Sequence, residues 1–353
     1  MALLQPHKIK IARTMRRLSM EQMVQRMGED AVSKMAISKI ERGLMRPSPS
    51  TIAAIAAACQ VPVSYFYSTE VNVGNMEFRF DKDADPKTEK QVKALVSYFV
   101  HDYFMLEADN MDAANFVSPV KQTTIRHYAD AEECAEQLRK KWHIGHQPIF
   151  SVYELLEECG IRVLELDFGC RHIDGVSAFV NEDIPIIIIN TCKNQTSERK
   201  RFTALHELAH LLFKFKPLTE KQHEAYLRTL PQLPYVVTEK TPDVEKLCNR
   251  FANAMLLPAQ SLLRRTGKTR TSIDLQELAS IRSRYGISVA ATIYRLHDLR
   301  VIDDDYYHYC FEEIISKNVL EEGWGKFPIE EKAEMAQLLK VRMEKEIRNI
   351  LDK

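Results

Sequence analysis

The sequence of 353 residues predicts an α+β fold that is mostly helical. Its first 68 residues hold short apolar-periodic segments closed by Gly and Pro, which is typical of a small all-α domain. Three later runs, at 161–166, 176–180 and 184–189, have the composition of strands and predict a small sheet. We therefore expect four regions: an all-α domain at 1–70, a linker and long helix at 71–117, an α+β domain at 118–302 and a helical C-terminal extension at 303–353.

Composition narrows the class of protein. The chain is 45% hydrophobic and 28% charged, as ordinary globular proteins are. Its longest apolar runs are far short of a membrane span, and the N-terminal stretch MALLQPHKIK lacks the apolar core of a secretion signal. Seven cysteines occur without a C-x-x-C pair, which favours reduced thiols over a disulfide framework. These features predict a cytoplasmic protein with no membrane partner.

The N-terminal region is basic and built from short helices. Residues 1–68 hold ten Lys and Arg against four acids, although the whole chain is neutral. Ser19, with Gln22 three residues later, predicts a helix that starts with a capping box and ends at Gly28. Ser33 is expected to cap the next helix, which stops at Gly43. Several short helices with exposed basic positions suit a helix-turn-helix bundle that binds a polyanion.

The motif V-S-x-x-x-I-S-x-I-E-R-G at 32–43, followed by Pro47 and Ser48, resembles the XRE (Cro/repressor-type) helix-turn-helix family. In that family the helix that follows Ser33 enters the major groove of double-stranded DNA at an operator. The resemblance implies DNA contacts by the exposed residues of this helix and its end, namely Lys34, Met35, Ser38, Lys39 and Arg42.

One departure from the family pattern affects the turn between the two helices. Glu29, Asp30 and Ala31 lengthen it and add two acids, which changes the expected docking angle. A helical bundle used for dimerisation or protein contact is the alternative interpretation. Ile37 and Ile40 are expected to be core residues in either case.

A polar, irregular stretch at 69–90 predicts a linker, and apolar residues recur at helical spacing from 87 to about 110. This long helix is expected either to pair with a second chain, which would make a homodimer, or to pack on the next domain. The sequence leaves both open. Helices at 129–142 and 152–159 then precede the three strands, whose edge can hold an extended peptide by strand addition.

The helix at 199–213, RKRFTALHELAHLLF, carries the pattern His-Glu-x-x-His. His206 and His210 are four residues apart and therefore stack on one helical face, where their imidazoles can share one divalent ion. Glu207 follows His206 directly and therefore lies one position further round the helix. A helix with two partnered histidines is the alternative interpretation.

A hydrolytic zinc site needs a third protein ligand. The class that adds a third His is excluded, because Phe213 and Lys216 stand at its Gly and His positions. A glutamate from a following helix is the remaining type, and Glu245 opens the next strong helical segment, at 244–257. Weaker candidates lie in the long, mobile loop that is predicted between the two helices: Glu220, His223 and Glu224.

The pattern E-x-x-C-N-x-F-A at 245–252, followed by Leu-Leu-Pro, resembles the ImmA/IrrE metallopeptidase family. The segments EFRF at 77–80, GVSAF at 175–179 and RFT at 201–203 extend the likeness, as does the helical pair at 275–285 and 289–299. Cys248 stands where the family motif carries Ala. The fused order of an XRE domain and a peptidase domain is a known arrangement in this family.

The second resemblance implies a zincin-like fold and a zinc endopeptidase of the gluzincin type. It assigns Zn²⁺ to His206, His210 and Glu245, and the role of general base to Glu207. Tyr226, His223 and Tyr294 are candidates for stabilising the oxyanion, and the sequence selects none of them.

Together the two resemblances predict a DNA-binding transcriptional regulator that cleaves a protein substrate. An XRE-type repressor is the expected substrate, in a stress or mobile-element response. In the alternative the metal domain is a sensor or an antitoxin-like protein-binding module with little catalysis. In the extension, Trp324, Phe327 and Pro328 are expected to form an ordered patch before a last helix at 330–351.

Overall fold

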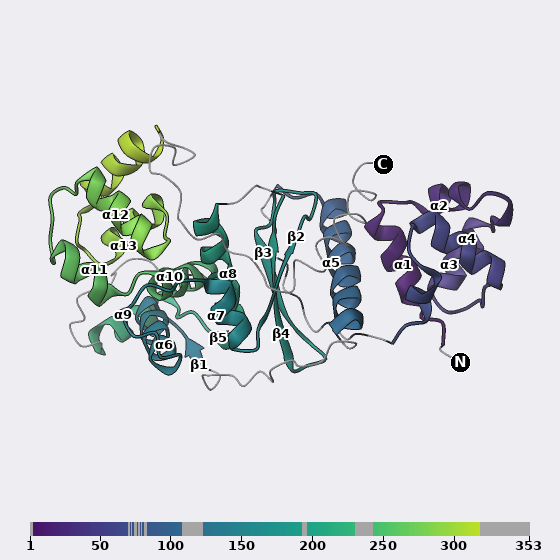
Figure 1. The fold of residues 1–353 in the computed structure, drawn as a ribbon, viewed down its shortest axis with the longest axis horizontal. Coiled ribbons are helices and arrows are strands. Elements are labelled where there is room, and N and C mark those ends of the chain that lie inside the picture. The colour runs from purple at the N-terminus through teal and green to yellow at the C-terminus, as the bar shows by residue number, and fades with distance from the viewer. Residues whose placement is uncertain are drawn as a thin grey trace.

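The computed structural model describes residues 3–69, 83–107, 123–192, 196–229 and 243–317, together with Val71, Val73, Met76, Phe78 and Phe80. Figure 1 shows an elongated arrangement of layers. The N-terminal helices lie at one end, followed by a long helix, a sheet and a further set of helices at the other end. The α+β, mostly helical class is confirmed.

The N-terminal domain consists of short helices, as the sequence predicts. Ser19 Oγ accepts from Gln22 N at 3.1 Å and the Gln22 side chain accepts from Ser19 N at 2.8 Å, so the capping box is confirmed. Ser33 caps the next helix by accepting from Ala36 N at 3.1 Å. The elements are α1 (Pro6–Met15), α2 (Met20–Arg26), η1 (Gly28–Asp30), α3 (Lys34–Glu41), α4 (Pro49–Cys59) and η2 (Val63–Tyr67).

The lengthened turn between α2 and α3 is a single 3₁₀ turn, η1, which takes up Glu29 and Asp30. Ile37 and Ile40 on α3 are fully buried, in agreement with the sequence. The Arg13 guanidinium on α1 pairs with the buried carboxylate of Glu41 at 2.6 Å. This ion pair and the two isoleucines fix α3 against the rest of the domain.

The long helix, α5 (Pro86–Glu107), lies between the N-terminal domain and the sheet (Figure 1). Of the two arrangements left open by the sequence, the structure shows packing on the next domain. Val96, Phe99 and Tyr103 belong to one apolar cluster that also contains α1 residues and the sheet residues Ile186 and Ile188. Burial of apolar surface on both sides therefore joins the two parts of the chain.

A buried lysine ties α5 to α1. Lys8 Nζ donates to the Ser68 carbonyl at 3.1 Å and to the Thr69 carbonyl at 3.2 Å, and lies 2.9 Å from His101 Nε2 on α5. Burial, with Lys8 as its neighbour, lowers the pKa of His101 to about 4. The imidazole is therefore neutral at pH 7, and its Nε2 can accept from the ammonium.

The sheet has three strands in the order β2-β4-β3. The strands β2 (Arg162–Leu166), β3 (Gly175–Val180) and β4 (Ile184–Asn190) match the three predicted runs. β4 is parallel to β2 and antiparallel to β3. Both faces are apolar, because Ile186 and Ile188 belong to the cluster around α5 and Ile187 and Ile189 to the cluster around the helix α8.

The remaining helices cover the other face of the sheet and extend away from it (Figure 1). A parallel pair of short strands, β1 (Thr123–Ile125) and β5 (Phe213–Phe215), was not expected from the sequence. The helices are α6 (Tyr128–Lys141), α7 (Val152–Glu158), α8 (Ser197–Leu212), α9 (Glu220–Thr229), α10 (Val244–Leu256), α11 (Ala259–Thr266), α12 (Leu275–Tyr285), α13 (Val289–Asp298), α14 (Asp304–Tyr309) and η3 (Cys310–Ile315).

A buried ionic cluster fixes three of these helices to one another. Glu132 on α6 is 1% exposed, and its carboxylate pairs with Arg250 on α10 at 2.5 Å and with Arg295 on α13. Arg250 also pairs with Asp298 at 2.5 Å. Removing one partner would leave an uncompensated buried charge, so this cluster holds α10 in a fixed position.

The C-terminal extension begins with α14 and the π-helix η3. The predicted patch at Trp324, Phe327 and Pro328 and the predicted helix at 330–351 lie outside the described residues. Among the helices that the structure describes, none has both the length and the apolar character needed to cross a membrane.

Candidate metal centre

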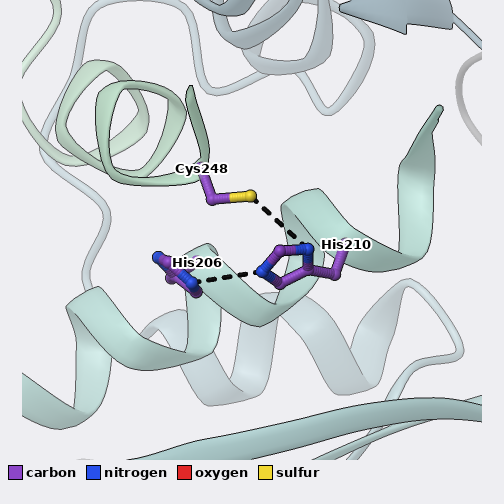
Figure 2. A group of neighbouring side chains, drawn as sticks. All are labelled: His206, His210 and Cys248. Atoms are coloured by element: carbon purple, nitrogen blue, oxygen red, sulfur yellow. Dashed lines mark hydrogen bonds between the residues drawn. The ribbon is translucent and has the colours of Figure 1, made fainter. Parts of the chain in front are cut away.

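The helix α8 presents its two histidines side by side. His206 Nε2 and His210 Nε2 lie 3.2 Å apart, because four residues advance the helix by about one turn. The side chains of His206 and His210 are only 15% and 10% exposed. Figure 2 shows the two imidazoles facing each other on α8, with Cys248 reaching in from α10.

The first turn of α10 brings a carboxylate to the same point. Glu245 Oε2 lies 3.1 Å from His206 Nε2, and Glu245 Oε1 lies 3.8 Å from His210 Nε2. Two ligands bound at about 2.0 to 2.1 Å to a tetrahedral zinc are about 3.3 to 3.4 Å apart. Two imidazole nitrogens and one carboxylate at these separations therefore fit a divalent zinc ion.

Asn249 orients the first imidazole. Its Oδ1 lies 2.8 Å from His206 Nδ1, and an amide oxygen can only accept a hydrogen bond. With the amide in this orientation, His206 carries its proton on Nδ1 and its Nε2 lone pair is directed toward His210 and Glu245. Partners of this kind set the tautomer of histidines that bind metals.

Cys248 contacts the opposite edge of the second imidazole. Its Sγ lies 3.5 Å from His210 Nδ1, and His206, His210 and Cys248 together form a group with metal-ligating side chains. The sulfur approaches Nδ1, however, whereas the other donors converge on Nε2 of the same ring. One ion cannot bind at both edges of an imidazole, so Cys248 and Glu245 are alternative third ligands: Cys248 lies on the Nδ1 side of His210 and Glu245 on the Nε2 side.

Glu207 lies under the edge strand β3. The carboxylate is buried and accepts from Ser177 Oγ at 2.8 Å. A Cβ on Gly175 would approach Thr203 Cγ2 to 2.9 Å and Glu207 Cγ to 3.3 Å. Glycine at this position therefore allows β3 to lie close against α8.

Comparison with known families agrees with this architecture. A helix-turn-helix family matches residues 9–66, and the IrrE N-terminal-like domain family matches residues 156–297. From N- to C-terminus, the chain thus carries a segment that matches XRE-type helix-turn-helix domains and one that matches IrrE/ImmA-like domains. A search among curated proteins returned no match. The IrrE-like match includes His206, Glu207, His210 and Glu245, whose roles in metal binding and catalysis stay predictions.

The structure also brings together a second histidine pair, His127 and His223, and part of the loop that was predicted around His223 is the helix α9. His223 and Tyr226 lie on α9, and their partners are at the start of α6. The ring centroids of His223 and His127 are 4.7 Å apart, and Tyr226 Oη donates to Asp130 at 2.5 Å. Burial, with His223 nearby, lowers the pKa of His127 to about 4. These contacts dock α9 on α6.

The other candidates from the sequence are placed as follows. Glu220 and Glu224 are exposed on α9. Tyr294 on α13 is 45% exposed and packs against Tyr307 and Phe311. The oxyanion-stabilising residue stays unassigned. Asn249 and Ser177 were not singled out from the sequence, because their roles depend on tertiary contacts.

The predicted DNA contacts gather on and just after α3 of the helix-turn-helix domain. Lys34, Met35, Lys39 and Arg42 are exposed, and Ser38 is half-buried. The Lys34 ammonium pairs with the Glu21 carboxylate on α2, and Arg42 Nε donates to the Ser38 carbonyl at 3.1 Å. Exposure makes this face available to a ligand, and direct contact with DNA stays a prediction.

Proposed function

We propose that the protein is a DNA-binding transcriptional regulator whose IrrE-like domain is a zinc-dependent endopeptidase. The observation that carries the proposal is the convergence of two imidazole nitrogens and one carboxylate within 3.1 to 3.8 Å, beside the buried Glu207. A binding-only domain has no need for a carboxylate next to such a centre.

In this proposal His206, His210 and Glu245 hold Zn²⁺, and Glu207 acts on the water that attacks the substrate. Bound zinc would lower the pKa of a water ligand toward neutrality and polarise the substrate carbonyl. Glu207 takes the proton of the attacking water and delivers it to the leaving amine. Asn249 keeps His206 in the tautomer that this arrangement needs.

An extended polypeptide is the substrate that the site suits best. β3 is an edge strand in the order β2-β4-β3, with an antiparallel bridge from its last residue, Val180, to Val73. It also carries Ser177, whose hydroxyl bonds to Glu207. A peptide that pairs with this edge would pass the metal centre with its backbone hydrogen-bonded. We propose a helix-turn-helix repressor as that substrate, with α3 holding the enzyme at its operator during a stress or mobile-element response.

The proposal is tested by incubating the full-length protein with the repressors encoded beside it, with and without a chelator. We expect cleavage that the chelator stops and zinc restores. Glu207→Gln should bind zinc and DNA as the native protein does while cleaving nothing, and Glu245→Ala should lose zinc as well. Cleavage by the Glu207→Gln variant would contradict the assignment.

One observation favours a second function, in which the metal domain is a sensor. A single apolar cluster runs from α3 through α1 and α5 to the sheet that supports α8. Metal occupancy at α8 would then change DNA binding without peptide cleavage. Two results together would support the sensor function over the peptidase function. The Glu207→Gln variant would regulate its promoter normally, and removing the metal from the protein would alter the affinity of the protein for DNA.

A further inference from the structure

Ser177 is a buried hydroxyl within the segment GVSAF, and the family resemblance assigns it no role. It is 8% exposed, and its Oγ donates to Glu207 Oε2 at 2.8 Å. The serine belongs to the edge strand β3, whereas Glu207 belongs to α8. The bond therefore links the sheet to the carboxylate next to the metal ligands.

Two backbone features fix the serine over the carboxylate. Ser177 is paired with Ile187 in the antiparallel ladder, and residues directly opposite share a face of the sheet. Ile187 faces α8, so the Ser177 side chain does too. Gly175, two residues earlier on the same face, allows the close approach of β3 to Thr203 and Glu207. The hydroxyl is thereby held before any substrate arrives.

We propose that Ser177 is a positioning residue for Glu207, an inference that rests on the proposed peptidase function. A carboxylate oxygen accepts a hydroxyl proton, and the 2.8 Å between Ser177 Oγ and Glu207 Oε2 is the usual length of an O–H···O hydrogen bond. Holding Oε2 in this way prevents the carboxylate from turning about its terminal bond. Glu207 thus keeps one orientation toward the attacking water, and the edge strand that receives the peptide also sets the general base.

The kinetic test compares Ser177→Ala with Ser177→Thr in the full-length protein. We expect Ser177→Ala to lower kcat by about tenfold to a hundredfold, since small misplacements of catalytic groups have effects of this size. KM for the repressor substrate and the affinity for zinc should stay within about twofold of the native values, because Ser177 binds neither in this account. Ser177→Thr keeps the hydroxyl and should recover most of kcat.

A second measurement needs neither substrate nor zinc. The unfolding free energies of the native protein, Ser177→Ala, Glu207→Ala and the double variant form a double-mutant cycle. We expect Ser177→Ala to cost stability when Glu207 is present and much less in the Glu207→Ala background. Ser97→Ala is the matched control, because this hydroxyl on α5 bonds only locally, to the Lys93 carbonyl at 2.8 Å, and should not couple to Glu207.

The outcomes separate this inference from the proposed function. An additive cycle would show that the hydroxyl does not act on Glu207, and an unchanged kcat in Ser177→Ala would show that holding the carboxylate is irrelevant to turnover. Either result overturns the inference while leaving the peptidase intact. If the native protein shows no metal-dependent cleavage, the proposed peptidase function fails. A non-additive double-mutant cycle would then show that the bond between Ser177 and Glu207 has a structural role alone.

Discussion

At the scale of single residues, the site depends on side chains that bind no metal themselves. Asn249 accepts from His206 Nδ1 at 2.8 Å and Ser177 donates to Glu207 at 2.8 Å. Both fix the direction in which a functional atom points. In zinc proteins, mutating a partner that orients a histidine ligand typically costs about 10- to 100-fold in metal affinity or activity.

Replacing Asn249 with Ala is expected to weaken zinc binding about 10- to 100-fold, because His206 loses the partner that keeps the proton on Nδ1. Competition with a chromophoric chelator measures the affinity. Asn253→Ala, one turn further along α10, is the matched control and should leave the affinity unchanged. Equal affinities for the native protein and Asn249→Ala would show that the amide does not orient the imidazole.

The sequence predicts part of this site and not the rest. The spacing of His206 and His210 suffices to bring them together, because the helical period alone decides it. The prediction of Glu245 as a ligand rests mainly on a family resemblance, and the structure brings its carboxylate close to the two histidines. The contact of Ser177 with Glu207 could not be predicted, since it depends on how β3 packs on α8. Nor could the sequence show that Cys248 approaches Nδ1 of His210 while Glu245 approaches Nε2, since this depends on how α10 packs on α8.

At the scale of elements, the attachment of α5 to α1 is expected to be acid-sensitive. The pKa of His101 is about 4 in the folded protein, because of burial and then Lys8, against about 6.5 in an unfolded chain. The unfolded state therefore binds the proton more readily. The stability that this group contributes is complete above about pH 6.5 and is lost as the pH falls toward 4.

Denaturant unfolding from pH 7 to pH 4 tests this expectation. The unfolding free energy of the native protein should fall over that range, and less steeply in His101→Gln, whose amide can still accept from Lys8. His127, whose pKa is also about 4, should maintain part of the slope. An identical pH dependence of the unfolding free energy in the two proteins would show that His101 does not contribute to the acid sensitivity.

Strong periodicity and capping residues made most elements predictable. The capping box at Ser19 and the three strands at 162–190 occur where the sequence placed them. The short strands β1 and β5 were not predicted, because three residues carry too little pattern. The prediction of a loop between α8 and α10 is wrong at α9, because this helix docks on α6 through His223 and Tyr226, which are tertiary contacts.

At the scale of the whole molecule, the predicted DNA-binding face and the candidate metal centre lie in different parts of one packed chain (Figure 1). If the exposed basic residues of α3 contact phosphates, the affinity for DNA should fall steeply with salt. Lys39→Ala should reduce the slope of log K against log salt by about 1. Titrations at several salt concentrations measure it, with the exposed Lys268→Ala as the control, and a slope near zero for the native protein would contradict DNA binding through phosphates.

The central claim is that one ion is held by two imidazoles from α8 and one carboxylate from α10. X-ray absorption at the zinc edge of the reconstituted full-length protein tests it most directly. The account predicts a first shell of nitrogen and oxygen only, at about 2.0 to 2.2 Å, with two imidazoles. A sulfur ligand at about 2.3 Å would identify Cys248 as a ligand and contradict the assignment of Glu245.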